Sequence, residues 1–573
     1  VPSWLLWMGS ELRIWGISPA SGTWLALVFL IAGAVDAASR WPSITEIIRR
    51  RRAGILTVLA IAVAIGALFL VVRAWNPAIH WGEKPMDFSF LNAFLRAPHW
   101  PPGEPWMAGM PLHYYYFGEV LAAFPMLVTG CSAGVGYNLI SATIPALFAV
   151  VLASVGLLLT RRRRVIAASA LPLLVLLTGN LAWPWLIESW REGNIFDVWW
   201  ATSRVIPGFA IDEYPLWTTL FADLHGHFIA FPVLVATFAW GWLCVEAGDR
   251  KWIASAVLCG IGAAVVVATN PWDLFILTST LGFGVMAAAR CRLRGLMRLG
   301  VAAVVSVLAA APFIVELMAG FTAGAGERGL FLTAQEFAPA WAILRHFGLF
   351  MIPLAVLALV LLGRRFWIIL PTAAIGIIAG LSFKSSAAAL SFAAFAIFVT
   401  VAARSKDRLD RLGWSMAALG MLAVAASERF TLIDRMNTIF KVYNGVWILL
   451  AFALAAALLR TRGRPLRVLL AVWAPLQLIA IANLPLGITQ GWALPRITSP
   501  RPSLDGQAFL ATQDPETWFL VRSLQGMARP DEAVAEAAGP SYREFTRISM
   551  HTGQPTVVGW AWHLQQRGQP VRE

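Results

Sequence analysis

Long apolar runs separated by short polar connections dominate the sequence. A membrane-spanning helix needs about 20 mostly apolar residues, and continuous runs of this kind favour helices over the alternating segments of a membrane barrel. The pattern predicts about 13 to 15 transmembrane helices. The candidate spans are residues 23–37, 54–73, 137–160, 165–182, 228–246, 252–268, 274–289, 299–318, 346–363, 366–380, 387–403, 412–426, 443–459 and 466–484.

Composition supports this interpretation. The chain of 573 residues is 58% hydrophobic and 13% charged, with a mean hydropathy of +0.68. Soluble domains carry about 25% charged residues, so a cytosolic enzyme, a nucleic-acid binder and a disordered protein are excluded. We expect an all-α polytopic membrane protein without a nucleic-acid partner.

Basic clusters fall at every second loop between the predicted spans, for example at 49–52, 161–164, 404–411 and 460–467. Loops rich in Arg and Lys stay on the cytoplasmic side, and the net charge of +14 is therefore interpreted as a topology signal. The intervening, longer loops then face outward. They cover residues 74–136, 183–227, 269–273, 319–345, 381–386, 427–442 and the tail from 485. Because loops on a rigid frame tend to carry function, we expect the active face to be extracytoplasmic.

Three regions follow from this topology. Residues 1–53 hold extra transmembrane segments, 54–484 form the main transmembrane domain with outer loops 74–136 and 183–227, and 485–573 form an outer domain. The last region is less hydrophobic, and we expect a small mixed α/β fold that packs on the loops.

The first outer loop holds an acid in an apolar setting. Asp87 lies between Met86 and Phe88 at the start of an amphipathic stretch. Such an acid can act as a general base or a metal ligand, although a helix cap or a solvated loop acid gives the same pattern. Further candidate substrate-binding residues of this loop are Glu83, His113, Tyr114, Tyr115 and Tyr116.

The second outer loop ends in FADLHGHF, which spaces Asp223, His225 and His227 by two residues. Histidine and carboxylate together suit a divalent transition metal, so these three residues are candidate metal ligands. The same histidines could bind a phosphate, orient an acid or lie at the interface without a role.

The remaining outer loops add polar residues at span ends. These candidate substrate-binding residues are Asp273, Lys384, Arg435, Asn437 and Lys441. The three cations could hold a phosphate, or each could simply extend to the membrane surface. No Walker loop or dinucleotide fingerprint is present, so we expect no nucleotide cofactor and an already activated substrate or a gradient as energy source.

Six motifs in order resemble one membrane family of bacteria and archaea, which is named for its Tyr-Tyr-Tyr run. They are EKPMDFSFLNAFLR, HYYYFGE, FADLHGHFIAFP, NPWD, DRMNTIFKVYN and GPSYREFTRISMHTGQPTVVGWAWH. That family is grouped with the GT-C glycosyltransferases, and the first loop is similar to that of protein mannosyltransferases and aminoarabinose transferases. Asp87 matches the position of their catalytic acid, and Tyr114 to Tyr116 match an aromatic run. Gly226, where the family pattern has Pro, and the extra spans before the first loop are departures.

The resemblance implies a GT-C-like helix bundle in the cytoplasmic (inner) membrane of a prokaryote. It implies transfer of a sugar from a polyprenyl-phosphate donor to a glycan, lipid or protein acceptor, with inversion, and membrane lipids as surroundings. Asp87 would be the base, with Asp223 and His225 as further catalytic candidates, and a divalent metal ion would be an optional cofactor. The tail motif, with Tyr542, Arg547, His551 and Trp560, would shape the acceptor side. A transporter, or a non-catalytic scaffold that binds a partner through its outer loops, remains an alternative.

Overall fold

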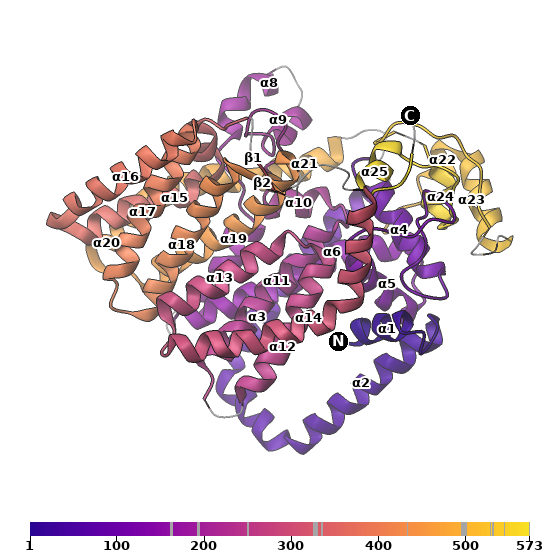
Figure 1. Ribbon diagram of the computed structural model, residues 1–573, viewed down its shortest axis with the longest axis horizontal. Helices are drawn as coiled ribbons and strands as arrows, with labels where there is room; N and C mark the ends of the chain where they lie inside the picture. The colour runs from indigo at the N-terminus through magenta and orange to yellow at the C-terminus, as the bar shows by residue number, and fades with distance from the viewer. Residues whose placement is uncertain are drawn as a thin grey trace.

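The computed structural model is almost entirely helical (Figure 1). It describes residues 1–160, 164–191, 195–248, 251–324, 331–333, 336–432, 434–493, 501–527, 529, 532–543 and 545–571.

The first half of the chain contains the following helices: α1 (Pro2–Glu11), α2 (Pro19–Ser39), α3 (Trp41–Trp75), α4 (Lys84–Arg96), α5 (Phe117–Thr129), α6 (Ala133–Leu159), α7 (Arg164–Leu176), η1 (Trp183–Leu186), α8 (Ile187–Arg191), α9 (Ile195–Ala201), α10 (Pro215–Phe221), α11 (Gly226–Glu246), α12 (Lys251–Thr269) and α13 (Asp273–Ala288).

The second half contains α14 (Arg292–Gly324), β1 (Phe331–Thr333), α15 (Ala340–Leu362), η2 (Gly363–Ile368), α16 (Ile369–Ser382), α17 (Ser386–Arg404), α18 (Arg408–Ser427), β2 (Phe430–Leu432), α19 (Arg435–Arg460), α20 (Gly463–Ile481), α21 (Asn483–Ala493), α22 (Leu510–Gln513), α23 (Pro515–Met527), α24 (Arg547–Thr552) and α25 (Ala561–Gln566). The two short strands pair antiparallel.

Among the described residues, 11 helical segments are long and apolar enough to cross a membrane. The all-α polytopic class is thus confirmed, but the expected 13 to 15 spans exceed this number. The segments predicted at 165–182 and 274–289 form α7 and α13, which have 13 and 16 residues. At 1.5 Å per residue such helices reach roughly 20–24 Å, short of the ~30 Å hydrocarbon core. The predicted span 366–380 falls in η2 and α16, which follow the end of α15 at Leu362 and are counted with α15 as one candidate segment, Ala340–Ser382.

The basic loops meet at one end of the bundle. Arg408 bonds to Glu246 and to the carbonyl of Ala288, and Arg460 bonds to Asp407 and to the carbonyl of Leu159. These contacts join the ends of α6, α11, α13 and α19. Because α11 and α19 run toward this end, their first residues lie at the opposite end, on the side where Figure 1 shows α8, α9, β1, β2 and α25. This packing is therefore consistent with the prediction that the basic loops lie on one side of the membrane and the longer loops on the other.

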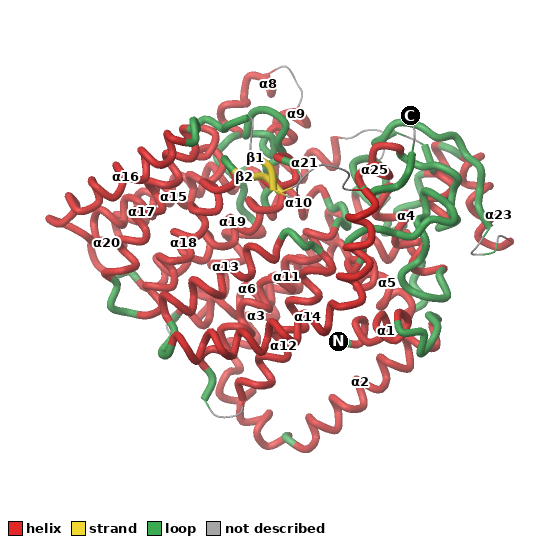
Figure 2. The backbone as a smooth tube through the Cα atoms, viewed as in Figure 1, coloured by secondary structure: helices red, strands yellow, loops and turns green. Residues whose placement is uncertain are grey.

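The C-terminal region packs on the first loop. The backbone N–H of Ala108 bonds to Thr556, that of Gly559 bonds to Trp106, and the buried Arg567 guanidinium lies 2.8 Å from Glu104. Figure 2 shows the loops gathered there around short helices. Among residues 501–571 that are described, no strand forms. The expectation of a mixed α/β fold is not supported, because this backbone bonds to the first loop rather than to a sheet of its own.

Two of the predicted domain boundaries fall inside helices. The boundary at residue 53 lies within α3, which runs without a break from Trp41 to Trp75. The boundary at residue 484 lies within α21. The apolar pattern identifies the membrane part of α3, but the helix continues beyond it through the four arginines at 49–52.

Candidate functional site

The start of α4 is formed by a tight turn that brings Asp87 inward. Trp81 and Gly82 both have left-handed backbone angles, with φ of 71° and 65°, and Pro85 lies in the first turn. A Cβ atom at Gly82 would lie 2.7 Å from the ring of Phe221, so glycine is required by space as well as by conformation. The turn places Asp87 in the first helical turn, where it is 2% exposed.

Asp223 holds the start of α4 in position. Its Oδ1 lies 2.6 Å from Lys84 Nζ, and its Oδ2 accepts the backbone N–H of Glu83 at 3.0 Å. Lys84 Nζ also lies 4.0 Å from the centre of the Phe221 ring. Both side chains are nearly buried, so each charge depends on the other. Asp223 was predicted to be catalytic, but these contacts occupy it with the backbone and side chain of α4.

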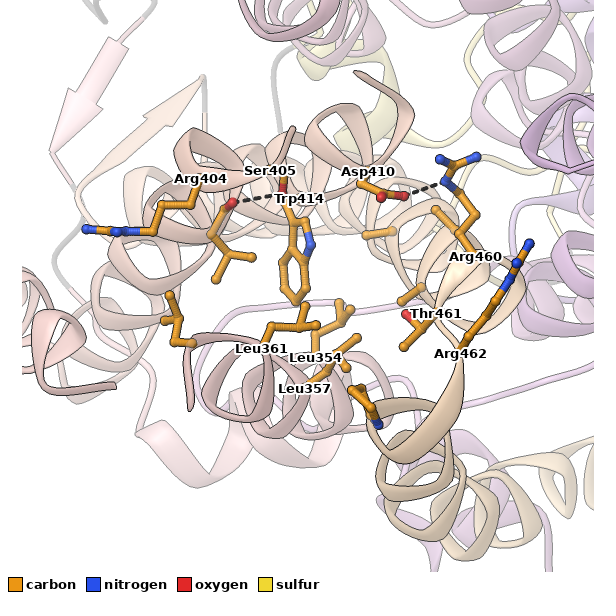
Figure 3. A pocket seen from close by; sticks show the side chains of 17 residues that line it. Leu354, Leu357, Leu361, Arg404, Ser405, Asp410, Trp414, Arg460, Thr461 and Arg462 are labelled. Atoms are coloured by element: carbon orange, nitrogen blue, oxygen red, sulfur yellow. Dashed lines mark hydrogen bonds and ion pairs between the residues drawn. The ribbon is translucent and has the colours of Figure 1, made fainter. Parts of the chain in front are cut away.

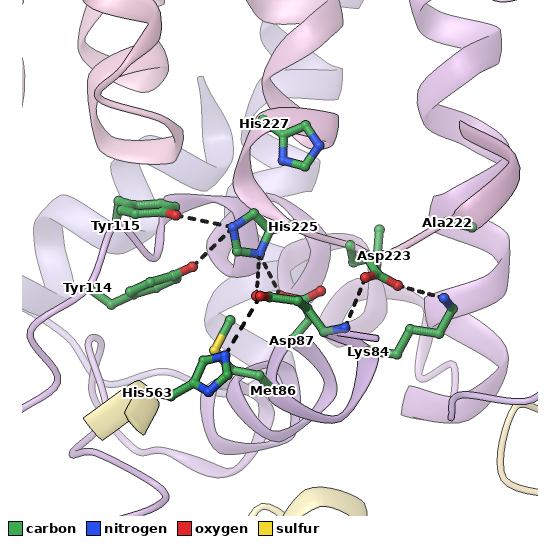
Figure 4. Close-up of polar contacts among 12 residues, drawn as sticks. Lys84, Met86, Asp87, Tyr114, Tyr115, Ala222, Asp223, His225, His227 and His563 are labelled. Atoms are coloured by element: carbon green, nitrogen blue, oxygen red, sulfur yellow. Dashed lines mark hydrogen bonds and ion pairs between the residues drawn. The ribbon is translucent and has the colours of Figure 1, made fainter. Parts of the chain in front are cut away.

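His225 lies between a carboxylate and two hydroxyl groups (Figure 4). Its Nδ1 is 3.2 Å from Asp87 Oδ1, and its Nε2 is 3.1 Å from Tyr115 Oη and 3.3 Å from Tyr114 Oη. The two tyrosine rings stack with centres 4.1 Å apart. Residues separated by more than 100 positions in the sequence therefore form one polar cluster, in which Asp87 and His225 are buried. We call it the His225 cluster: Glu83, Asp87, Tyr114, Tyr115 and His225.

The surroundings fix the protonation of His225. Burial, together with the positive charge of Lys441, lowers the pKa of His225 to about 4, so the ring is neutral at pH 7. Its Nδ1 also lies 3.5 Å from the Glu83 carboxylate. With carboxylates on that side, Nδ1 carries the proton and donates it, and Nε2 accepts from the tyrosines. Burial raises the pKa of both Tyr114 and Tyr115, which keeps their hydroxyls as donors.

The two carboxyl groups of the cluster have opposite pKa shifts. Burial, with the negative charges of Asp223 and Glu83, raises the pKa of Asp87 well above its usual range. For Glu83, burial acts in the same direction, but the nearby His563 and His225 side chains and the charge of Lys441 outweigh it, so the pKa of Glu83 is lowered. Asp87 is therefore the stronger base. Its second oxygen, Oδ2, is buried without a hydrogen-bond partner among the described residues.

The C-terminal region contributes to the cluster through Glu83. Tyr542 donates its hydroxyl to Glu83 Oε1 at 3.1 Å, and His563 Nε2 lies 3.7 Å from the same oxygen. Tyr542, which the resemblance places on the acceptor side, reaches the cluster through its contact with Glu83. His563 was not singled out, because nothing in its local sequence distinguishes it from a packing residue.

A second buried group lies beside the cluster and is centred on His227. Its Nδ1 is 3.2 Å from Lys441 Nζ, and its Nε2 is 3.9 Å from Glu213. The rings of His225 and His227 have centres 5.4 Å apart, so the two groups adjoin. Lys441 lies close enough to Asp273 for an electrostatic interaction. Glu213 and Lys84 are not among the predicted site residues, because a single charged residue carries no local signal of a partner far away in the sequence.

The predicted metal ligands Asp223, His225 and His227 do not form one metal site in the described structure. Within the described parts of the chain, no three His, Cys, Asp or Glu side chains are placed to hold one metal ion. Asp223 faces Lys84, His225 faces Asp87, and His227 faces Lys441. The physical reason is the change from an irregular link to a helix at Gly226, which turns the last histidine toward α19.

The other predicted residues lie outside the His225 cluster. Tyr116 donates to Glu316, Asn437 bonds to Asp434 at the start of α19, and Lys384 is exposed. Arg435 is buried and donates to the carbonyl of Pro207, and its Nε and Nη2 have no hydrogen-bond partner among the described residues. His113 is half-buried.

Glycine is required by space at position 226. A Cβ atom at this position would lie 2.1 Å from the backbone oxygen of Thr269 and 3.2 Å from the ring of Tyr115. Any side chain, including that of proline, would push α12 and the tyrosine pair away from His225. This glycine lets the start of α11 approach its neighbours closely.

Comparison with known proteins gives the family and distant structural likenesses. No curated protein matches the chain. An archaeal oligosaccharyltransferase AglB from Archaeoglobus fulgidus, solved with an inhibitory peptide and a dolichol-phosphate, is 13% identical with a TM-score of 0.43, over 88% of this chain and 64% of that one. The Archaeoglobus fulgidus oligosaccharyltransferase solved with Zn and sulfate is 15% identical with a TM-score of 0.42, over 88% of this chain and 62% of that one. The chain thus spans less than two thirds of the length of these proteins. Residues 1–450 match the family described as "Uncharacterized membrane protein (DUF2298)", and the chain belongs to this membrane protein family.

Proposed function

We propose that this protein is a membrane glycosyltransferase. It transfers a sugar from a polyprenyl-phosphate donor to an acceptor hydroxyl on the extracytoplasmic face, and Asp87 is the general base. The proposal rests on the resemblance of the first loop to GT-C enzymes and on the geometry of the His225 cluster. The observation that carries it is the state of Asp87: one oxygen is held by His225, and the other is buried with no hydrogen-bond partner in the part of the chain that the structure describes.

This arrangement suits proton abstraction. A carboxylate whose pKa is raised by burial is a stronger base than one in water, and His225 holds its other oxygen in a fixed direction. The tyrosine pair in turn fixes the His225 ring through Nε2. His225 is therefore a positioning residue, and Asp87 Oδ2 is the atom that takes the proton.

The proposed step is a single displacement. Asp87 takes the proton of the acceptor hydroxyl while the acceptor oxygen forms a bond to the anomeric carbon. The bond from that carbon to the phosphate oxygen breaks, and polyprenyl phosphate leaves with the negative charge. Attack from the face opposite the leaving group inverts the anomeric centre.

The leaving phosphate needs a cation close to the base. Lys441 is 2% exposed, belongs to the group beside the cluster and interacts with Asp87 and Glu83. We assign to Lys441 the stabilisation of the departing phosphate, since a cation in a water-poor site stabilises charge that develops there. Arg435 is the second candidate for this phosphate: its Nε is buried without a hydrogen-bond partner among the described residues, and its Nη2 lies 3.9 Å from Glu428.

The test is sugar transfer by the purified protein in nanodiscs. Radiolabelled polyprenyl-phosphate hexoses serve as donors, and glycan, lipid and peptide fractions serve as acceptors. Asp87→Asn should lower the transfer rate by roughly 10²–10⁴-fold, because the amide cannot take the proton. The matched control is Glu516→Gln, the same chemical change at an exposed acid of α23.

Two results would contradict the proposal in different ways. Full activity in a folded Asp87→Asn variant would assign the base elsewhere, with Glu83 next. No transfer by the wild-type protein from any donor would reject glycosyl transfer and favour a transporter or scaffold.

A further inference from the structure

The bundle has a cavity at the end opposite the His225 cluster (Figure 3). Its volume is about 350 Å³, and α15, α17, α18 and α19 supply most of its wall, with the start of α20. The end at which it lies is the one where the basic loops meet. By the positive-inside pattern this is the cytoplasmic end.

The inner wall of the cavity is apolar. Leu354, Leu357 and Leu361 of α15 line one side, and Trp414 projects between them and the mouth. Small residues of α19, among them Ala457, leave the space open. Such a wall offers no partner for a polar group, so the inner part of the cavity suits a hydrocarbon chain.

The mouth carries three arginines and one aspartate. Arg460 is fully engaged: it bonds to Asp410, to Asp407 at 2.6 Å and to the carbonyl of Leu159 at 3.0 Å. These bonds neutralise the charge of Asp410 and hold the side chain of Arg460 in place at the mouth of the cavity.

Arg404 and Arg462 are different. Both are exposed, and neither has a hydrogen-bond or ion-pair partner within the part of the chain that the structure describes. Figure 3 shows them on opposite sides of the cavity, with their stems along it and their head groups extended away from it. Long cationic side chains at a membrane end extend in this way to the level of lipid head groups.

We propose that this cavity is a binding site for an anionic phospholipid of the adjacent leaflet. One acyl chain lies against the leucines and Trp414, and the phosphate group lies outside the mouth, at the level of lipid head groups to which Arg404 and Arg462 extend. Basic pockets between transmembrane helices on the cytoplasmic side are suited to anionic lipid head groups, and guanidinium groups bind phosphate in a bidentate manner. This site is independent of the proposed glycosyl transfer and lies at the other end of the bundle.

The charge side of the proposal is tested by lipid retention. The full chain is reconstituted with equal amounts of phosphatidylglycerol and phosphatidylcholine with identical acyl chains, and the bound lipid is measured by native mass spectrometry. Phosphatidylglycerol should be retained preferentially. Arg404→Gln/Arg462→Gln should weaken its binding by about thirty-fold, at about one kcal/mol for each arginine.

The matched control is Arg292→Gln/Arg294→Gln, which removes the same charge from exposed arginines at the start of α14. It should leave the retention unchanged. Equal loss in both double variants would overturn the site, because the attraction would then come from general basic charge. Equal retention of the two lipids by the wild-type protein would overturn it without any variant.

The apolar side is tested by filling the cavity. Ala457→Phe places a ring in the space proposed for the acyl chain and should abolish retention of phosphatidylglycerol, whereas inorganic phosphate alone should not compete with the lipid. A change of oligomeric state in Ala457→Phe with unchanged lipid retention would instead identify the face as a contact between two copies and overturn the proposal.

Discussion

Replacing Lys84 by Met tests whether Asp223 is a structural residue. The change keeps most of the apolar stem and removes the charge that lies 2.6 Å from Asp223. The two side chains are 7% and 10% exposed, so water cannot replace the missing partner. Breaking a buried ion pair by removing one member costs about 3–5 kcal/mol. We expect Lys84→Met to lose about this much of the free energy of unfolding.

A double-mutant cycle separates the pair from its surroundings. Asp223→Asn keeps an oxygen that can accept the Glu83 backbone N–H, and we expect it to be destabilising because it leaves the Lys84 charge buried alone. Lys84→Met/Asp223→Asn removes both charges. It should be more stable than the sum of the single effects predicts, with a coupling energy of about 2–3 kcal/mol.

The pH dependence of stability tests the same ion pair independently. Burial raises the pKa of Asp223 in the folded protein, and loss of Lys84 raises it further. A carboxyl group with a raised folded-state pKa binds its proton more tightly when folded, so Lys84→Met should regain stability as the pH is lowered from 7 toward 5. Lys84→Met/Asp223→Asn should lack this regain.

The assay is unfolding in mixed micelles, followed by thiol labelling of the buried Cys244 and Cys259. A Lys84→Met variant as stable as the wild type, or a strictly additive double variant, would refute the structural role. Asp223 would then return to the catalytic candidates.

Two further predictions concern the same region. Burial lowers the pKa of His225 to about 4, so below pH 6.5 the unfolded chain binds a proton that the folded protein does not. The free energy of unfolding should therefore fall by up to about 3 kcal/mol between pH 6.5 and pH 4. Unfolding measured over a series of pH values should show that His225→Gln removes this loss. Gly82→Ala should destabilise the protein by about 2 kcal/mol or more in the same assay, since the backbone is left-handed and the new Cβ meets Phe221; no loss would mean that the turn rearranges without cost.

The membrane architecture could be predicted because its signals are local. Apolar run length identified the long spans, and the alternation of basic loops identified which helix ends lie together, as the contacts of Arg408 and Arg460 show. The predicted 13 to 15 spans exceed the 11 candidates among the described residues, because some apolar segments form helices too short to span. The segments of α7 and α13 are apolar enough for a span, but their helices have 13 and 16 residues.

The members of the candidate site were predictable, but their pairing was not. An acid in an apolar stretch identified Asp87, and the spacing of polar residues identified Asp223 and His225. Their roles depend on partners far away in the sequence, since Lys84 and Asp223 are 139 positions apart. A lysine before a proline has the local pattern of an exposed loop residue, and only the fold buries it against Asp223 and Phe221.

The three predicted metal ligands of the second loop do not come together in the described structure. A spacing of two residues does not determine where side chains point until the backbone conformation is known. In an extended chain, positions two apart point to the same side, and the three polar residues of DLHGH would share one face. In this protein the chain is irregular up to His225 and helical from Gly226 onward. The conformation changes between the two histidines, so His225 turns to Asp87 on α4, and His227 turns to Lys441 on α19. The close approach of Thr269 allows only glycine at the point of change. Gly226 therefore helps to divide one sequence motif between two neighbouring polar groups.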